Sequence, residues 1–300
     1  MDIRVLRNFI QIARDESLTK ASKKLHISQP ALSRQMKELE EELNVKLFNR
    51  TSYAIHLTRE GVRLLQRAED IVSMADQTLR EFSEKQDTIS GDIRIGASEG
   101  ESVRILGQCM KRIKALYPDI FYHMYTGDTE MLREKLDNGF LDFLAVSENP
   151  DTSGYQSIKL PIRDRWGLIM PKNDPLNQKK TISRDDLMNL DLIVSRQALH
   201  QDLPAFFEDK THRLRIIATY DLAHNSTLLA KEGVGYVLCF DHLADISENS
   251  GLVFRAISPP LYTDMHLIYR KHQMFSKPAE LFLTTLKEIM QEAKKQAENT

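Results

Sequence analysis

The sequence predicts a protein of mixed architecture, with an all-α N-terminal part followed by a larger α/β part. Three features predict this. Short helices separated by a tight turn fill the first 43 residues, a long helix with heptad spacing follows, and strands then alternate with helices from residue 92. A chain of 300 residues with 41% hydrophobic and 28% charged residues is an ordinary globular protein, and it is long enough for two or three compact units.

Charge, cysteine usage and hydropathy exclude several classes of protein. The formal net charge is only −2, but residues 1–58 carry ten Lys/Arg and seven Asp/Glu, which is a weak pointer to DNA binding at that end. Cys109 and Cys239 lie far apart without ligand-like spacing, which favours buried thiols over a disulfide, a metal site or a redox role. The chain has no apolar run of 18 residues and no signal-peptide core, so we expect a cytoplasmic protein without a membrane partner.

The first 43 residues predict three helices. The first covers residues 5–15; Ser17 is a suitable N-cap for a second that ends near Leu25, and Ser28 for a third that ends near Leu43. In the third helix, apolar residues recur at intervals of four, three and four on one buried face: Leu32, Met36, Leu39 and Leu43. Two short helices joined by a tight turn form a helix-turn-helix, whose second helix enters the major groove of DNA.

The opposite face of the third helix has side chains suited to reading DNA. Glutamine can bind adenine, arginine can bind guanine, serine can bind a base edge or a phosphate, and proline can contact a thymine methyl group. A lysine further along the helix suits a phosphate. The alternative is the solvated face of any amphipathic helix, and the short helix and tight turn before it favour the DNA-binding interpretation. The predicted contacts are Gln29, Pro30, Ser33, Arg34 and Lys37.

A long helix is predicted from residue 59 to about residue 84, because this stretch has no Gly or Pro after Gly61. Its apolar positions alternate in spacings of three and four, the seam of a two-stranded coiled coil: Leu65, Ala68, Val72, Ala75, Leu79 and Phe82. The alternative is a helix that packs on its own domain. A dimer formed through this seam would have two DNA-reading heads and would bind dyad-related half-sites on double-stranded DNA.

The N-terminal motifs resemble those of the LysR-type transcriptional regulators. They are LTKASKKLHISQPALS at 18–33, ISQPALSRQMKELEEELNVKLFNR at 27–50 and LTREG at 57–61. The resemblance implies a two-stranded wing at residues 44–58, with Arg50 near the DNA backbone or groove. It also implies a small-molecule effector, pairing of linker helices in a homodimer, assembly into a homotetramer, and RNA polymerase as a possible partner. The chain departs from the family at the wing tip, where it has Tyr53 and Ala54 in place of a basic residue and a glycine.

From residue 92 the chain alternates between strands and helices, which is typical of a parallel sheet covered by helices. The series starts with strands at 92–97, 120–125 and 141–146, and a similar series recurs up to residue 270 before a last helix. The segments GFLDFLAVSE and LLAKEGVGYVL resemble landmarks of the family's two-lobed, periplasmic-binding-protein-like sensor, between whose lobes the chain would cross twice, near 160–163 and 262–266. The expected domains are a winged helix-turn-helix at 1–58, a linker helix at 59–89, and a sensor at 90–300 with lobe I at 90–161 and 266–300 and lobe II at 162–265.

In an open α/β sheet, ligands bind beyond the carboxyl ends of the strands, which in a two-lobed domain is the cleft between the lobes. Free amides at helix starts there favour an anionic group such as a carboxylate. Glu99 intrudes, however, and we hypothesise that it faces an amino or other cationic group of the effector; the alternative is a solvated or Arg-paired Glu99. The candidate effector residues are those that follow the strands: Ser98, Glu99, Gly100, Thr126, Gly127, Asp128, Ser147, Ser195, Arg196, Gln201 and Asn225.

The rival interpretations are a small-molecule-binding enzyme with an appended DNA-binding domain and a purely architectural DNA-binding protein. The chain has no GxGxxG, GxxxxGK[ST], GxSxG or HExxH motif, and its nine histidines are scattered. We therefore expect no catalytic residues, no metal and no cofactor. An architectural protein would not need a two-lobed cleft. The interpretation that remains is a sequence-specific transcriptional regulator, not an enzyme, whose activity depends on an effector bound between two lobes.

Overall fold

The structure of the protein, a computed structural model, describes residues 1–50, 55–83, 89–147 and 153–298, with the backbone alone at residues 50, 77, 80–83 and 296–298. It divides into two compact units, residues 1–86 and residues 87–300. The first unit is helical with one small sheet, and the second is α/β, so the predicted fold class is confirmed. Among the described residues, no helix is long and apolar enough to cross a membrane.

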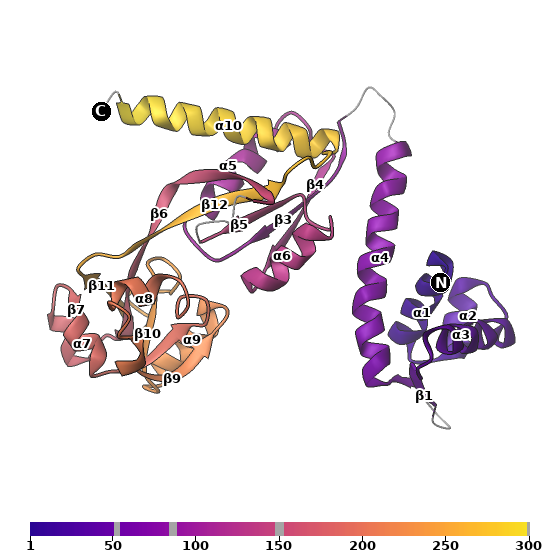
Figure 1. Cartoon of the computed structure of the whole chain (residues 1–300), viewed down its shortest axis with the longest axis horizontal. Helices are drawn as coiled ribbons and strands as arrows, with labels where there is room; N and C mark the ends of the chain where they lie inside the picture. The colour runs from indigo at the N-terminus through magenta and orange to yellow at the C-terminus, as the bar shows by residue number, and fades with distance from the viewer. Residues whose placement is uncertain (51–54, 84–88, 148–152, 299–300) are drawn as a thin grey trace. The chain divides into compact units, whose positions relative to one another are not determined.

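Three helices open the first unit, and they are drawn in indigo in Figure 1: α1 (Ile3–Asp15), α2 (Leu18–Leu25) and α3 (Gln29–Leu43). The predicted N-cap Ser17 accepts a hydrogen bond from Lys20 N at 3.3 Å. Ser28 takes the N-cap position of α3 with extended backbone but makes no side-chain cap bond. Each helix ends on a residue in the left-handed conformation, which turns the chain sharply enough to keep the connections short.

A two-stranded sheet closes this unit. β1 (Phe48–Arg50) and β2 (Ile55–Leu57) pair antiparallel, with Phe48 opposite Leu57. The carboxylate of Glu40 on α3 is buried and accepts hydrogen bonds from Leu47 N at 2.8 Å and from Phe48 N at 3.3 Å, so it ties α3 to the start of the sheet. The predicted wing tip, with Tyr53 and Ala54, and the side chain of Arg50 lie outside the described residues.

The helix α4 (Arg59–Ser83) has nearly the predicted length. Thr58 starts it by accepting a hydrogen bond from Gly61 N at 2.9 Å. Along much of its length α4 packs against α1, and an Arg7–Asp76 ion pair reinforces this contact. The N-terminal half of this helix therefore contributes to the core of the first unit.

The second unit has two lobes, each built on part of one mixed sheet. In lobe I, β3 (Gly91–Ala97) pairs in parallel with β4 (Ile120–Thr126) and with β5 (Phe143–Val146). Helices α5 (Val103–Lys114) and α10 (Lys277–Glu298) cover one face, and α6 (Thr129–Asp137) covers the other. Phe143 lies at the centre of the larger core and stacks on Phe275 with ring centroids 5.0 Å apart.

Lobe II repeats this design. Its parallel strands are β8 (Asp191–Ser195), β9 (Arg215–Tyr220) and β10 (Tyr236–Phe240). β11 (Leu252–Ser258) pairs antiparallel with β6 (Tyr155–Pro171). The remaining elements of lobe II are η1 (Pro175–Gln178), β7 (Ile182–Ser183), α7 (Arg184–Met188), α8 (Asp202–Phe206), η2 (Thr211–Arg213) and α9 (Ala223–Lys231).

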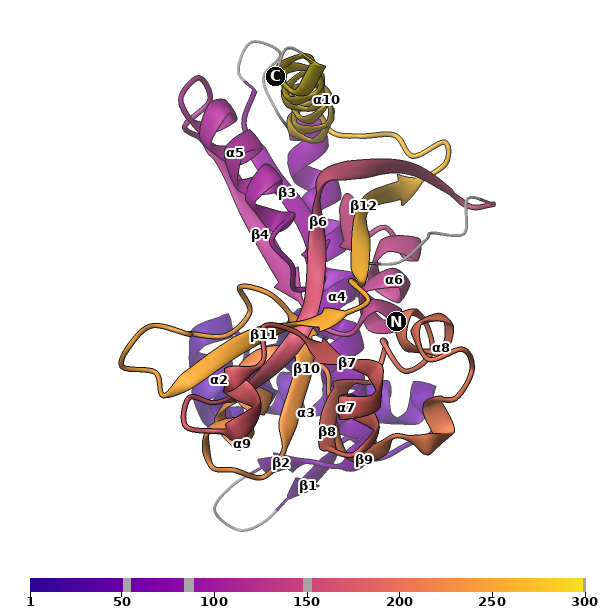
Figure 2. The ribbon, with the colours of Figure 1, turned by 90° about the vertical axis from the view of Figure 1, so that its left-hand side faces the viewer.

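Two long strands connect the lobes. β6 (Tyr155–Pro171) leaves lobe I and enters lobe II, and β12 (Tyr262–Arg270) returns beside it, as Figure 2 shows. The crossings predicted near 160–163 and 262–266 lie within these two strands. Paired backbone therefore joins the two lobes. Such a hinge favours bending over free rotation.

Candidate nucleic-acid interface and effector cleft

The predicted recognition helix α3 has one buried face and one exposed face. Leu32 and Met36 are fully buried and Leu39 is 2% exposed, and all three pack against α1 and α4 in one core. On the other side Gln29, Pro30, Arg34 and Lys37 are exposed, and Ser33 is half-buried. Asn8 on α1 donates from its Nδ2 to Gln35 Oε1 at 2.8 Å, and this bond holds the helix in its orientation.

The two cations of this face are held by carboxylates of the same helix. Arg34 Nε lies 2.9 Å from Glu38 Oε1, and Lys37 Nζ lies 3.5 Å from Glu41 Oε1. Both are exposed i,i+4 pairs, which contribute only about 0.3–0.5 kcal/mol. A phosphate or a guanine edge can therefore replace either carboxylate at little cost in free energy.

The predicted dimer seam divides into an inner and an outer part. Ala68 is fully buried, and Leu65 and Val72 pack against the same core, so the alternative of a helix packed on its own domain holds for this half. Ala75 is half-buried and Leu79 is 67% exposed. The side chain of Phe82 lies outside the described residues. Leu79 is thus a position of the predicted seam that stays exposed in the single chain, and pairing through the seam stays a prediction.

The second unit contains a cleft between its lobes, at the carboxyl ends of the parallel strands. It holds about 580 Å³ of space, part of which is open solvent, and clefts between lobes are where small-molecule ligands commonly bind. The predicted residues that line it are Ser98, Glu99, Gly127, Asp128, Ser147 and Ser195.

The other predicted effector residues do not line the cleft. Gly100 packs on Asp164, and a Cβ there would lie 2.7 Å from the carboxylate. Thr126 and Asn225 are exposed elsewhere on the lobes. Arg196 pairs with Asp221, and Gln201 accepts a hydrogen bond from Gln197 Nε2 at 3.0 Å. These two residues therefore position lining residues without facing the cleft themselves.

Several lining residues were not predicted: Trp166, Gln197, Ala198, Asp202, Tyr220, Asp221, Phe240 and Leu243. Tyr220 and Asp221 stand at the end of β9, where the rule used for the other strands would have found them. Trp166 and Phe240 lie in neighbouring antiparallel strands, with ring centroids 4.6 Å apart. Only the order of the strands in the sheet brings them together.

Two hydrogen bonds join the lobes across the cleft. Glu99 Oε2, after β3 of lobe I, accepts from Ala223 N at the start of α9 in lobe II at 2.6 Å. Thr129 Oγ1, in α6 of lobe I, donates to Gln197 Oε1 of lobe II at 2.9 Å. Glu99 is therefore bound to a helix start instead of an arginine. The predicted free amide at the start of α9 is occupied by this carboxylate.

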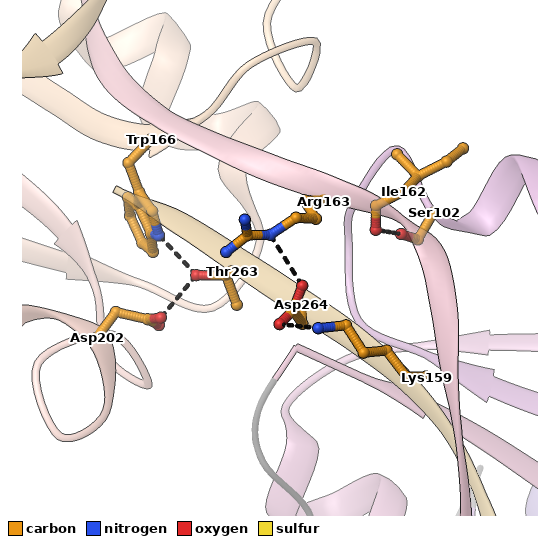
Figure 3. A network of polar contacts seen from close by, with 8 residues as sticks. All are labelled: Ser102, Lys159, Ile162, Arg163, Trp166, Asp202, Thr263 and Asp264. Carbon is orange, nitrogen blue, oxygen red and sulfur yellow. Dashed lines mark hydrogen bonds and ion pairs between the residues drawn. The ribbon is translucent and has the colours of Figure 1, made fainter. Parts of the chain in front are cut away.

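Polar contacts also fix the two crossing strands, as Figure 3 shows. The indole of Trp166 on β6 donates to Thr263 Oγ1 on β12 at 2.8 Å, and that hydroxyl donates to Asp202 Oδ1 at 2.6 Å. Next to Thr263, the Asp264 carboxylate binds Lys159 at 2.5 Å and Arg163 at 3.0 Å. These contacts tie the two crossing strands to each other and to α8 of lobe II.

A buried carboxylate lies in the same hinge. Asp164 on β6 is 2% exposed; its Oδ1 accepts from Glu101 N at 2.7 Å, and its Oδ2 is among the described buried atoms without a hydrogen-bond partner. Burial raises the pKa of Asp164 to about 6, and the charge of Glu101 adds to the rise, against the Glu101 N–H bond and nearby His242. The folded-state pKa of Asp164 exceeds the unfolded value of 3.8. The free energy of unfolding therefore decreases as the pH rises from the lower pKa to the higher one.

We therefore expect Asp164→Asn to stabilise the second unit at pH 7.5 by about 1–2 kcal/mol. This gain is smaller than the free energy that corresponds to the whole pKa shift, because the new amide N–H also has no hydrogen-bond partner. The difference in free energy of unfolding between this variant and the wild type should decrease as the pH falls towards 4. Urea unfolding followed by Trp166 fluorescence measures both, since Trp166 is the only tryptophan. Exposed Asp119→Asn serves as the control, and a pH-independent gap would contradict the assignment.

The described residues offer little for catalysis. No group of three or more His, Cys, Asp or Glu among them could hold a metal ion. Burial raises the pKa of the Cys109 thiol to about 12 and raises that of Cys239 further. Neither thiol is a nucleophile at neutral pH, because the thiolate is the reactive form.

Comparisons with known proteins identify the class of protein. Residues 3–62 match the family model "Bacterial regulatory helix-turn-helix protein, lysR family", and residues 86–291 match "LysR substrate binding domain". A DNA-binding helix-turn-helix joined to a ligand-binding α/β domain defines a ligand-responsive transcriptional regulator. The chain belongs to the LysR family of these regulators.

Individual relatives agree with this assignment. A probable RuBisCO transcriptional regulator of Thalassiosira pseudonana is 31% identical over 65% of this chain and 66% of its own length, just under two thirds. An uncharacterized HTH-type transcriptional regulator, YfeR of Shigella flexneri, is 24% identical over 93% of this chain and 91% of its own. The crystal structure of CbnR, a LysR family transcriptional regulator, has the same fold, with a TM-score of 0.72 and 20% identity over 97% of this chain and 99% of that one.

Proposed function

We propose that this chain binds specific DNA sites through α3 as a homodimer or homotetramer and that an effector in the inter-lobe cleft controls its action at a promoter. The observation that carries the proposal is the division of α3 into a buried apolar face and an exposed polar one. The solved complex of CbnR with its target DNA, with a TM-score of 0.71, supports it by analogy. The site of action is then the cytoplasm, where the chromosome lies.

The effector acts through the hinge. A ligand that contacts both lobes favours one angle between them, and it shifts the equilibrium only by its difference in affinity for the two arrangements. The change then alters the spacing of two DNA-reading heads, DNA bending and the access of RNA polymerase. Footprinting across the genome tests the proposal directly: it should find dyad-related half-sites, and its failure to find preferred sites would contradict it.

Arg34→Ala and Lys37→Ala should have different effects on DNA binding. Arg34 lies one turn from the start of α3, where side chains reach base edges, so its loss should weaken binding to the operator by about 1–3 kcal/mol and relax sequence preference. Lys37 lies nearly one turn further along α3. Its loss should weaken binding to all sequences nearly equally and reduce the salt dependence of binding. Gel shifts with operator and scrambled duplexes at several salt concentrations measure both effects.

The matched control is Lys111→Ala, which removes one exposed positive charge from α5 in the other unit and should change neither quantity. Loss of sequence discrimination in Lys37→Ala alone would reverse the two assignments. Unchanged operator binding in both α3 variants would remove α3 as the reading helix.

The rival proposal, an enzyme with an appended DNA-binding domain, has less support. The cleft has carboxylates and hydroxyls, but neither cysteine is poised for attack, and the family is one of regulators. We therefore propose that the bound effector leaves the cleft chemically unchanged. Recovery of intact effector after prolonged incubation with the protein is the expected result, and turnover would favour the enzyme.

A further inference from the structure

The charges that line the inter-lobe cleft are all of one sign. Four of its lining residues are carboxylic acids, namely Glu99, Asp128, Asp202 and Asp221, and the described lining contains no Lys, Arg or His. One cation near this group, Arg196, binds Asp221 from outside the lining with a side chain 59% exposed. An anionic ligand would lose its hydration there and gain no opposite charge, which is costly in a partly enclosed site.

Two helix starts at the cleft are also occupied by carboxylates, those of α6 and α9. Asp128 Oδ1 accepts hydrogen bonds from Glu130 N at 2.9 Å and from Met131 N at 3.3 Å, and so caps α6. Glu99 takes the start of α9, whose own N-cap residue, Leu222, makes no side-chain cap bond. Backbone amides at a helix start are a common site for anions. Here the chain's own carboxylates already fill that role, so these amides do not recruit an anionic effector.

The rest of the cleft suits the organic part of a cation. Trp166, Tyr220 and Phe240 supply aromatic surface, and Leu243 and Ala198 supply aliphatic surface. Aromatic rings attract cations through their faces, and most strongly where water is excluded. Carboxylates beside aromatic rings therefore form a site for an ammonium or guanidinium group with an apolar body.

We propose that the effector is an organic cation, an amine or guanidinium compound whose charged group lies between Glu99 and Asp128. This inference rests on the proposed function only in taking the cleft as the effector site, and the match of residues 86–291 to a substrate-binding domain independently indicates a ligand there. Each carboxylate has a second oxygen that can accept a hydrogen bond from the ligand. The ligand class is therefore set by side chains that also hold the helix starts of the two lobes.

The test compares two series of probes, each with three different end groups on a similar carbon chain. 2-Phenylethylamine, 3-phenylpropionate and 2-phenylethanol are titrated into the full-length protein, together with 1,5-diaminopentane, glutarate and 1,5-pentanediol. Trp166 fluorescence reports binding because this tryptophan lines the cleft and is the only one in the chain. In at least one series the amine should bind about tenfold or more tighter than the carboxylate and the alcohol.

Three variants separate charge from structure. Glu99→Gln and Asp128→Asn keep an oxygen acceptor for Ala223 N and for the start of α6, because an amide side chain still caps a helix, and each should weaken amine binding about tenfold. Glu130→Gln removes an exposed charge two residues from Asp128 and outside the lining, and should leave binding unchanged. The melting temperature of each variant, followed by Trp166 fluorescence, shows whether the fold is retained.

The proposal is overturned if in both series a carboxylate or alcohol binds as tightly as its amine, if neither charge-neutral variant weakens amine binding, or if no amine in either series alters Trp166 fluorescence. Gel shifts on the footprinted operator keep the two claims distinct. Sequence-specific DNA binding without amine binding would refute the ligand class alone. Absence of sequence-specific binding would refute the regulator, whatever binds in the cleft.

Discussion

Glu40→Ala should destabilise the N-terminal unit by about 3–4 kcal/mol, because it leaves two buried backbone donors without an acceptor. The Glu40 carboxylate accepts from Leu47 N and Phe48 N and also binds Lys46 Nζ at 3.1 Å. Leu47 is fully buried, so water cannot replace the lost acceptor. The substitution should loosen the wing from α3 and reduce DNA binding together with stability.

Two neighbouring substitutions give the scale for this effect. Glu40→Gln keeps one oxygen for Leu47 N and should cost about 1–2 kcal/mol. Glu41→Ala removes the next carboxylate, which is exposed, and should change stability by less than about 0.5 kcal/mol. Urea unfolding followed by far-UV circular dichroism reports the helices of both units, whereas Trp166 fluorescence reports the second unit alone. Only the circular dichroism transition should move.

The pH dependence of Glu40 has the opposite sign to that of Asp164. Burial is the largest single influence and raises the pKa of Glu40, but the hydrogen bonds from Leu47 N, Lys46 and Phe48 N together outweigh it and lower the pKa. The stability that Glu40 supplies is thus complete above its unfolded value of 4.5 and is lost as pH falls through the folded value. The difference in free energy of unfolding between wild type and Glu40→Gln should vanish on acidification. A difference that does not change with pH would contradict this account.

Local sequence signals predicted most of the N-terminal unit. Apolar spacing placed α3, and Ser17 marked the start of α2, because caps and periodicity act over a few residues. The same spacing left two interpretations open along α4. Positions such as Ala68 repeat as a dimer seam would, but they pack on α1, since periodicity shows that a face is buried and not what buries it.

The cleft was predictable only in part. Residues directly after a strand, such as Ser98 and Asp128, could be placed because parallel strands end at one edge of their sheet. Trp166 could not, since the strand before it, with Pro161 and several charges, gave no clear signal for the continuous β6. The partner of Glu99, Ala223 N, is 124 residues away in sequence, so only the folded chain pairs them.

Gly61→Ala should be the most damaging of the small substitutions, although alanine is the better helix former. Gly61 is in the first turn of α4, and a Cβ there would lie 2.2 Å from Leu47 O and 3.0 Å from Leu57 Cδ2. The carbonyl cannot move freely because it accepts a hydrogen bond from Thr58 N at 2.9 Å. This close approach gives the glycine of the LTREG motif its physical reason.

The same substitution at Gly107 should have the opposite sign. Gly107 lies within α5, and a Cβ there would meet no atom within 4 Å, so Gly107→Ala should stabilise the second unit by about 0.5–1 kcal/mol. At Gly61 a similar gain in helix propensity is outweighed by the backbone clash, and we expect a net loss of about 3 kcal/mol. Circular dichroism should detect the loss and Trp166 fluorescence the gain. If both variants gained stability alike, helix propensity alone would explain the effect at Gly61, and a Cβ at the start of α4 would not clash with the wing.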